Sequence, residues 1–369
     1  MNVRSIQYQN FRSHRILTFE PGEGITLIHG PNGSGKTSIL EGIHYCALTK
    51  SHVSATDGEC LHFTSDYFVL NGSFFSDNEV STTVKIVYKK EKEKQIIVDN
   101  CEVKPFSRHI GRIPCVTFSP SEMVIVNGVP AERRRFIDTL ISQTQRKYLD
   151  DLLDYRRVLH QRNALLAQLF SGHNIHKDML LLWTENISRL AASIVYARIQ
   201  FLASFFDQFR ALYQQLSVDE IPSVIYKCSL GNISNDTSPE ALYARFLARY
   251  EETCKQEVLR GQTMTGPHRD DLLFLLHDKE IKKYASRGQL RTFLIALKLA
   301  QYRFYQETLG EKPLFLLDDI FSELDVSRTS DIFGILETCG QTIITSAEKK
   351  GERKAKMVSI ESLKQIKEY

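Results

Sequence analysis

The stretch LIHGPNGSGKTSILEGIHY, Leu27–Tyr45, decides the fold. The apolar and β-branched residues 25–28 predict a short, buried, parallel strand. The next residues match the phosphate-binding pattern of glycine, four free positions and Gly-Lys-Thr, and they are Gly30, Pro31, Asn32, Gly33, Ser34, Gly35, Lys36 and Thr37, with Ser38 following. An apolar helix is expected to begin at Lys36. This order of strand, loop and helix predicts a P-loop that binds a nucleoside triphosphate.

The residue types of this loop suit phosphate chemistry. Glycines are needed because backbone N–H groups must converge on phosphate oxygens, where a Cβ would obstruct the turn. The helix N-terminus adds its dipole and unpaired N–H groups. We expect Lys36 to reach the β- and γ-phosphates of ATP, and the Thr37 hydroxyl to coordinate Mg²⁺. The alternative, a glycine-rich turn without a ligand, does not account for the strand and helix on either side.

Composition sets the class of protein. The chain has 369 residues, of which 42% are hydrophobic and 25% charged, as is typical of a soluble globular protein. We find no apolar run of membrane-spanning length and no signal peptide, so we expect a cytoplasmic protein without membrane contact. The seven cysteines are scattered without C-x-x-C spacing, which predicts reduced, mostly buried thiols. A net charge of +3 neither requires nor excludes nucleic acid.

The chain changes character twice along its length. Up to about Cys115 it is strand-rich, with expected strands at Val3–Tyr8, Leu17–Phe19, Ile25–Ile28, Phe68–Phe75, Thr82–Tyr88 and Gln95–Val98, and KKEKEK (89–94) as a solvated hairpin tip. Helical periodicity runs from Pro130 to about Phe170 and again around residues 183–201, which predicts a short antiparallel arm. A further helix is expected from Pro239 to about Arg260, and strand character resumes near Asp271. An α/β layer is therefore interrupted by a mainly helical insertion.

A second motif, KPLFLLDDIFSELD, lies near the other end of the chain at Lys312–Asp325. Residues 314–317 predict a buried strand that ends in Asp318 and Asp319. A carboxylate at the end of a core strand beside a P-loop is the usual partner of Mg²⁺. We assign Asp318 to the metal and Asp319 to the attacking water. Two adjacent acids that merely cap a helix are the alternative.

A third motif, ASRGQLRTFLIALKLAQ, places Ser286, Arg287, Gly288 and Gln289 before a helix whose N-terminus could meet a phosphate. A P-loop enzyme that acts alone does not need such an element. ABC-type ATPases have a Ser-Gly-Gly-Gln loop that completes the site of a second subunit, so that ATP lies between two protomers. Residues 322–325, which end in Asp325, would then be a dimer-facing loop.

Together these motifs resemble the RecF family of bacterial recombination-mediator ATPases, relatives of the SMC heads. The resemblance spans essentially the whole chain and rests on NFRS (10–13), GPNGSGKTSILEGI (30–43), FSPSEMVIVNGVPAERRRFID (118–138), GPHRDDL (266–272), SRGQLR (286–291) and LLDDIFSELD (316–325). It implies an α/β fold, an ABC-type P-loop ATPase head. Residues 1–115 and 290–369 would form an ATP-binding lobe I with a mixed β-sheet, and 116–289 a helical lobe II with the short arm and the signature loop.

The resemblance also implies roles. Ser286 and Gly288, with Gln289 beside them, would face the γ-phosphate held by the opposite subunit of a homodimer, and Asp325 would lie in the dimer-facing loop. Arg12 resembles an early arginine of the family and is expected near the nucleotide, unless it is only a solvated turn residue. The implied partners are DNA, at single-strand gaps and junctions, and RecR, which assists recombinase loading.

Three features depart from the family pattern. The segment TKSHVS (49–54) has lysine, histidine and valine where arginines are frequent, Arg287 replaces a glycine, and TIITSAE (342–348) lacks the switch histidine of transporters. The missing histidine predicts slow hydrolysis, and the resemblance implies that DNA stimulates it. Candidate DNA contacts are basic residues of the helical lobe, with intramolecular ion pairs as the alternative, and they are Arg133, Arg134, Arg135, Arg156, Arg157 and Arg162.

Three other functions are possible for a P-loop protein. A transporter ATPase subunit would need the switch histidine and a shorter insertion. A monomeric P-loop kinase would leave SRGQLR without a role. A scaffold that binds ATP without cleaving it would leave Lys36, Asp318 and Asp319 unexplained.

Overall fold

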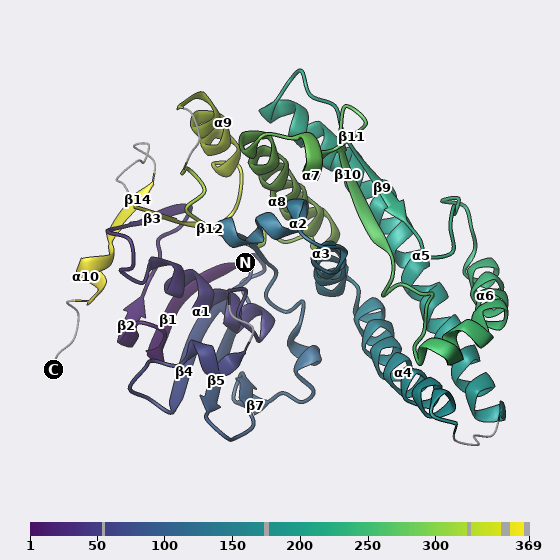
Figure 1. The fold of residues 1–369 in the computed structure, drawn as a ribbon. Helices are drawn as coiled ribbons and strands as arrows, with labels where there is room; N and C mark the ends of the chain where they lie inside the picture. Colours follow the sequence, from purple (N-terminus) through teal and green to yellow (C-terminus); the bar gives the residue numbers. More distant parts are fainter. Residues whose placement is uncertain (54–55, 173–176, 323–325, 348–354, 365–369) are drawn as a thin grey trace. The chain divides into compact units, whose positions relative to one another are not determined.

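The computed structural model describes residues 1–369 except 54–55, 173–176, 323–325, 348–354 and 365–369 (Figure 1). Contacts divide the chain into two compact units. Unit 1 comprises Met1–Met123, Gln215–Val218 and Ser286–Tyr369, and unit 2 comprises Val124–Gln214 and Asp219–Ala285. The insertion expected from the sequence is thus a unit of its own. Its identification as the second lobe of an ABC-type head stays a prediction.

Unit 1 contains two sheets where the sequence suggested one mixed sheet. A five-stranded parallel sheet has the order β14-β3-β13-β12-β8, with β3 at Ile25–His29, β8 at Cys115–Phe118, β12 at Leu314–Asp318, β13 at Thr342–Ser346 and β14 at Lys356–Ser359. A six-stranded antiparallel sheet has the order β2-β1-β4-β5-β6-β7, with β1 at Asn2–Phe11, β2 at His14–Phe19, β4 at Tyr67–Phe75, β5 at Ser81–Lys89, β6 at Gln95–Val98 and β7 at Cys101–Glu102. All the strands predicted in this unit are confirmed.

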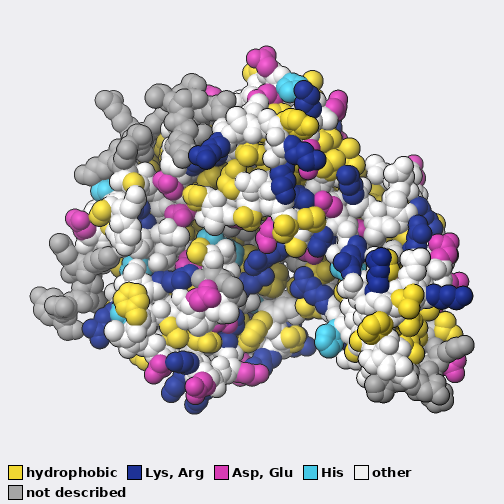
Figure 2. Space-filling view, in the orientation of Figure 1, with side chains coloured by type: hydrophobic (Ala, Val, Ile, Leu, Met, Phe, Trp, Pro, Cys, Tyr) yellow, Lys and Arg dark blue, Asp and Glu magenta, His cyan; other side chains and the backbone are white. Residues whose placement is uncertain are grey.

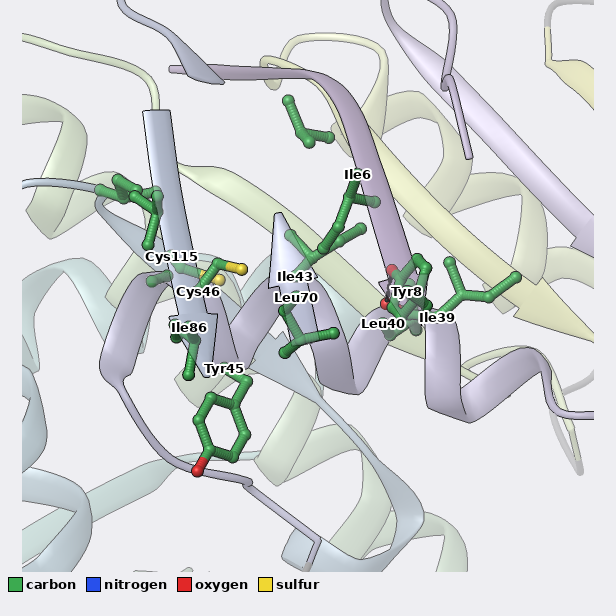
Figure 3. Close-up of a cluster of buried hydrophobic side chains, with 14 of the residues drawn as sticks. Ile6, Tyr8, Ile39, Leu40, Ile43, Tyr45, Cys46, Leu70, Ile86 and Cys115 are labelled. Carbon is green, nitrogen blue, oxygen red and sulfur yellow. Dashed lines mark hydrogen bonds between the residues drawn. The ribbon is translucent and has the colours of Figure 1, made fainter. Parts of the chain in front are cut away.

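Helix α1, Lys36–Leu48, packs against strands of both sheets, which explains why it is apolar around its circumference (Figure 3). Ile39, Leu40 and Ile43 join β1, β4 and β5 in one buried cluster. Gly42 lets strand β1 approach α1 closely, since a Cβ at this position would lie 2.2 Å from the Tyr8 ring. The Tyr8 hydroxyl also donates a hydrogen bond to the Ile39 carbonyl at 2.7 Å. This packing fixes the helix that follows the P-loop.

The remaining elements of unit 1 are short, apart from one long helix. Helix α8 spans Arg287–Leu309 and packs on β8, and α9 spans Val326–Leu336, α10 Ile360–Lys364, and the 3₁₀ turns η1 Asp57–Cys60, η2 Phe106–His109 and η3 Pro120–Met123. The KKEKEK hairpin tip is largely exposed, as expected, but Lys94 is not. Its Nζ donates to the Thr49 carbonyl at 2.7 Å and lies 2.9 Å from an Asp57 carboxylate oxygen.

Unit 2 is mainly helical. Its helices are α2 Val124–Asn127, α3 Pro130–Thr144, α4 Arg146–Phe170, α5 Lys177–Leu216, α6 Pro239–Arg260 and α7 Ile281–Tyr284. The predicted helix 239–260 is confirmed, and the helical stretch expected from Pro130 to about Phe170 is two helices with a break at Gln145. A small antiparallel sheet has the order β11-β10-β9, with β9 at Pro222–Lys227, β10 at Asp271–Leu276 and β11 at Lys279–Glu280. Strand β9 was not anticipated.

Helices α4 and α5 form the predicted antiparallel pair. Lys147 near the start of α4 contacts Ser193 at 3.0 Å, whereas Arg162 further along α4 contacts the earlier Thr184 at 3.2 Å. Later positions on α4 therefore contact earlier positions on α5, which shows that the two helices are antiparallel. Among the described residues, one helical stretch, Asp178–Leu216, is long enough and apolar enough to cross a membrane, contrary to the expectation from sequence. Half of the most apolar window of this helix is buried, and by itself the helix is weak evidence for a membrane span.

The cysteines are free thiols, as expected, but fewer are buried than predicted. Cys46, Cys60 and Cys115 are buried, three others are intermediate, and Cys101 is exposed.

Candidate functional site: a phosphate-binding pocket at the edge of the parallel sheet

The predicted P-loop connects β3 to α1. Gly35 is the N-cap of α1 and has a φ of 97°, in the left-handed region that favours glycine. A Cβ at this position would also lie 2.4 Å from the Ser13 Oγ. Lys36 Nζ donates to the carbonyls of Gly30 at 2.7 Å and Pro31 at 2.9 Å, so its ammonium is held over the loop. Burial lowers the pKa of Lys36, and the charges of Asp318 and Asp319 oppose that shift.

Three oxygen-bearing side chains meet where the P-loop faces the end of β12. Thr37 Oγ1 donates to both carboxylate oxygens of Asp318 at 3.0 Å. Thr345, paired with Asp318 across β12 and β13, donates from its Oγ1 to Asp318 Oδ1 at 2.5 Å. Carboxylate and hydroxyl oxygens are ligands that Mg²⁺ accepts together with phosphates and water. The residues present therefore fit the predicted metal, whose binding stays a prediction.

The turn after β12 is tied to helix α8. Asp319 has a φ of 49°, and its N–H donates to the Thr345 carbonyl at 3.1 Å. Arg291 on α8 donates from Nη2 to the carbonyls of Asp319 at 2.8 Å and Ile320 at 3.1 Å. Sequence reasoning missed Arg291 because a buried arginine four positions past the helix start carries no local signal. The acidic turn and the SRGQ helix are consequently one connected structure.

Arg12, at the turn between β1 and β2, is bound to Glu41. Its Nε and Nη2 donate to the two Glu41 carboxylate oxygens at 2.8 and 2.7 Å, and its Nη1 donates to the Glu59 carbonyl at 2.8 Å. Burial alone would lower the pKa of Arg12, but the hydrogen bonds and charge of Glu41 raise it above its ordinary value. Glu41 is 2% exposed and also accepts from Ser51. Glu41 itself was the sequence signal for this ion pair, because it is an acid in a mainly apolar helix.

These groups line one pocket of about 670 Å³, large enough for a nucleotide. Its lining includes Arg12, Ser13, Asn32, Gly33, Ser34, Gly35, Lys36, Thr37, Ser38, Glu41, Val53, Glu59, Leu61, Phe63, Pro120, Asp318, Asp319, Thr345 and Ala347. The structure thus brings together the predicted P-loop residues, Arg12 and both acids. Gly30 and Pro31 contribute carbonyls that hold Lys36. Asp325 lies outside the described residues.

The segment SRGQ is the first turn of a helix, whereas the sequence suggested a loop before one. Helix α8 begins at Arg287, and Ser286 is its N-cap. Ser286 Oγ accepts from the Gln289 N–H at 3.2 Å, and the Gln289 side chain accepts from the Ser286 N–H at 2.8 Å, which is a capping box. Ser286 and Gly288 are exposed. Their contact with a second subunit stays a prediction.

Two of the candidate DNA-contacting arginines are structural. Arg133 is 8% exposed and forms a two-point ion pair with Asp271 at 2.7 and 2.9 Å. Arg162 is 0% exposed and lies 2.6 Å from Glu257. The intramolecular alternative is correct for both, and Arg134 is half-buried against the Asp270 carbonyl. Arg135, Arg156 and Arg157 are exposed, and Figure 2 shows Lys and Arg spread among acidic side chains over the visible face.

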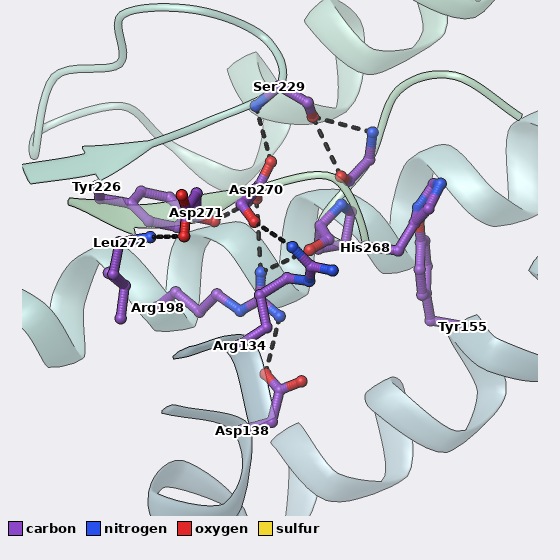
Figure 4. Close-up of polar contacts among 12 residues, drawn as sticks. Arg134, Asp138, Tyr155, Arg198, Tyr226, Ser229, His268, Asp270, Asp271 and Leu272 are labelled. Atoms are coloured by element: carbon purple, nitrogen blue, oxygen red, sulfur yellow. Dashed lines mark hydrogen bonds and ion pairs between the residues drawn. The ribbon is translucent and has the colours of Figure 1, made fainter. Parts of the chain in front are cut away.

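The GPHRDDL segment forms a buried polar network in unit 2 (Figure 4). Asp270, at 0% exposure, accepts hydrogen bonds from the Tyr226 hydroxyl and, at 2.7 Å, from the Ser229 N–H. Arg198 lies 3.5 Å from Asp270 and 2.8 Å from Asp138, so one buried guanidinium links two acids. The segment is therefore a structural junction between α3, α5 and β10.

His268 is expected to make this network sensitive to acid. Its Nδ1 is 2.6 Å from the Tyr155 hydroxyl, and burial lowers the pKa of His268 to about 4. In the unfolded chain the His268 ring binds a proton near pH 6.5. The stability that the neutral ring contributes is therefore fully present above that pH and is lost as the pH falls toward 4. We expect the part-exposed ring to account for about 2 kcal/mol of this loss.

Urea unfolding between pH 7.5 and 4 tests this expectation. His268→Gln should show a shallower loss of unfolding free energy on acidification than the wild type. His160→Gln, at an exposed position on α4, should follow the wild type. Equal slopes for wild type and His268→Gln would assign the acid sensitivity to other groups.

Comparison with known proteins agrees with this architecture. A family model described as an AAA domain matches residues 5–216. The DNA replication and repair protein RecF of Chlorobium luteolum is 53% identical over 363 residues, covering 98% of each chain. A solved structure of the recombination mediator protein RecF with ATP, of the RecFOR pathway, aligns with a TM-score of 0.89 at 28% identity and covers 95% of this chain and 93% of that one.

A more distant structural similarity concerns the fold. An SMC head bound to the C-terminal winged-helix domain of ScpA aligns with a TM-score of 0.57 at 13% identity and covers 95% of this chain and 90% of that one, a similarity of fold alone. The P-loop, the acidic strand end and the near full-length identity to a curated relative lead to one assignment. The chain belongs to the RecF family of DNA replication and repair proteins, on the fold shared by RecF and SMC-head ABC ATPases.

Proposed function

We propose that this chain is a weak, DNA-stimulated ATPase of recombinational repair, which binds ATP and Mg²⁺ in the pocket described above. The observation that carries the proposal is the contact between Thr37 and Asp318, 281 residues apart in sequence and 3.0 Å apart in the fold. Such a pair beside a P-loop is what a metal-bound triphosphate requires. The relatives are named for DNA replication and repair, and a solved neighbour of this family is described with ATP.

Each pocket residue has a role in this proposal. Lys36 would exchange its two loop carbonyls for β- and γ-phosphate oxygens, while backbone N–H groups of residues 33–38 hold the phosphates. Mg²⁺, held by Thr37 and Asp318, would neutralise charge on the phosphates. Asp319 would orient the attacking water. Thr345, in the segment that lacks the switch histidine, donates a hydrogen bond to Asp318 and is not a titratable base. This supports slow hydrolysis.

The ATP-bound state would be a homodimer. Ser286, Gly288 and Gln289 at the exposed start of α8 would meet the γ-phosphate bound by the other protomer, where helix N–H groups attract an anion. ATP then contributes contacts to both protomers, so the dimer is favoured only while the γ-phosphate remains. Hydrolysis removes these contacts and opens the dimer. Asp325 is proposed to lie at the same interface.

The object held by the dimer is proposed to be DNA at single-strand gaps and junctions. Phosphate contacts by exposed arginines such as Arg135, Arg156 and Arg157 would make the binding strongly salt-dependent. The RecFOR pathway named for the solved neighbours supports RecR as the partner that acts next. Recombinase loading at the gap, in the cytoplasm, is the task that follows.

Mixing two inactive variants tests the composite site. Ser286→Asp retains a good N-cap, so α8 keeps its start, while the added charge repels a γ-phosphate. Lys36→Ala removes the loop ammonium. Each variant alone should hydrolyse little ATP in the presence of gapped DNA. An equimolar mixture should recover about a quarter of the wild-type rate, because half of the dimers are mixed and each of those has one intact site.

The matched control is Ser238→Asp, at the N-cap of α6, which should leave hydrolysis unchanged. A mixture as inactive as its components would show that the site is complete within one chain or that Ser286 has no role in trans. A wild-type rate that is strictly linear in protein concentration and indifferent to DNA would contradict the clamp itself.

A further inference from the structure

Phe63 is an aromatic side chain placed in the pocket and left open to solvent. It exposes 89% of its surface, yet it lines the pocket that contains the P-loop. Its backbone is anchored, because the preceding His62 donates its N–H to the Asn10 carbonyl at 2.9 Å and is itself 8% exposed. Leu61 forms a β-bridge with Phe11. Hydrogen-bonded backbone thus fixes the position of a solvent-exposed apolar ring in the lining of the pocket.

The pocket has two chemically distinct ends. Thr37, Asp318 and Thr345 mark the end that takes the metal and the γ-phosphate. The lining also includes residues of the β1–β2 turn, Arg12 and Ser13, and of the chain after α1, Val53, Glu59, Leu61 and Phe63. Ser13 lies against Gly35, and the Arg12 N–H donates to the Cys60 carbonyl at 2.8 Å, so the β1–β2 turn contacts both the P-loop and the segment that carries Phe63.

A nucleotide seated by its phosphates must extend its base away from the metal. The base is a flat, uncharged aromatic group, and it is stabilised by stacking on an aromatic face and by apolar contacts. On that side the lining offers Phe63, with Leu61 and the 47%-exposed Val53 as apolar neighbours. The phosphate end is charged and polar and has no aromatic ring among its lining residues.

We infer that Phe63 is the platform on which the base of the bound nucleotide stacks. This inference rests on the proposed function, since it assumes that the P-loop holds a triphosphate. Stacking tolerates any base, so Phe63 contributes affinity for nucleotides in general and does not select adenine. Arg12, bound to Glu41, lines the same pocket.

Calorimetric titration of the full chain with ATP, GTP and inorganic triphosphate tests the inference. Phe63→Ala should bind ATP and GTP about tenfold more weakly than the wild type, while its affinity for triphosphate stays the same. The matched control is Phe170→Ala, which removes another exposed phenyl ring, 64% exposed at the end of α4, and should change none of the three affinities.

A spectroscopic readout gives a second test. The chain has one tryptophan, so Phe63→Trp in a Trp183→Phe background reports on position 63 alone. ATP should quench its fluorescence and triphosphate should not. Equal ATP affinity of wild type and Phe63→Ala, or an equal loss for ATP and triphosphate, would overturn the inference and leave the proposed function standing. A wild type that binds neither ATP nor triphosphate would overturn both.

Discussion

Replacing Lys36 with alanine is expected to lower ATP hydrolysis by at least about 100-fold, the scale on which removal of one preorganised charge acts in other enzymes. The ammonium is held over the loop by two carbonyls at 2.7 and 2.9 Å, so it needs little reorganisation to meet a phosphate. Phosphate release with saturating Mg²⁺-ATP and gapped DNA measures the effect. Because the Lys36 ammonium donates to carbonyls of the loop itself, the fold should persist without it, as the far-ultraviolet circular dichroism spectrum would show.

Lys85→Ala is the matched control for this result. Lys85 lies exposed on β5, so its loss removes the same charge without touching the pocket. Hydrolysis by this variant should equal that of the wild type. Wild-type hydrolysis that survives in Lys36→Ala would mean that the loop does not hold the transferred phosphate, and the nucleotide site proposed for this pocket would be wrong.

Arg162→Met is expected to destabilise unit 2 by about 3–5 kcal/mol, as does removal of one partner from a buried ion pair in other proteins. The Arg162 guanidinium is fully buried, donates to Glu257 at 2.6 Å and to Thr263 at 2.8 Å, and lies 4.8 Å from the centre of the Tyr250 ring. Its loss leaves the buried Glu257 carboxylate without its cationic partner. Denaturant unfolding followed by circular dichroism measures the change.

Two further variants separate burial from charge. Arg157→Met removes an arginine from the same helix, but that residue is 74% exposed and pairs with Asp154 at 3.1 Å at the surface, so its stability should change by less than about 0.5 kcal/mol. The double variant Arg162→Met with Glu257→Leu should recover much of the lost stability, since no buried charge is left alone. A single Arg162→Met variant as stable as the wild type would refute the buried-pair account.

The elements that sequence could predict are those specified by neighbouring residues. The P-loop is a contiguous pattern, the acidic strand end follows four apolar residues, and the helix at Pro239–Arg260 begins with a serine cap and proline and ends at a glycine. Each of these signals is complete within a few positions. The order of such segments was also enough to indicate the RecF family.

The tertiary structure decided what each polar side chain is for. Arg162 and Glu257 are 95 residues apart, and Arg133 and Asp271 are 138 apart, so no local pattern distinguishes these buried ion pairs from a basic surface. Phe63 and strand β9 lack a local signal for a similar reason, since their surroundings come from distant chain. The sequence alone determined the P-loop, the acidic strand end and the family, because each of these depends on motifs of adjacent residues. Burial and pairing depend on which distant segments the fold brings together, and only the structure shows them.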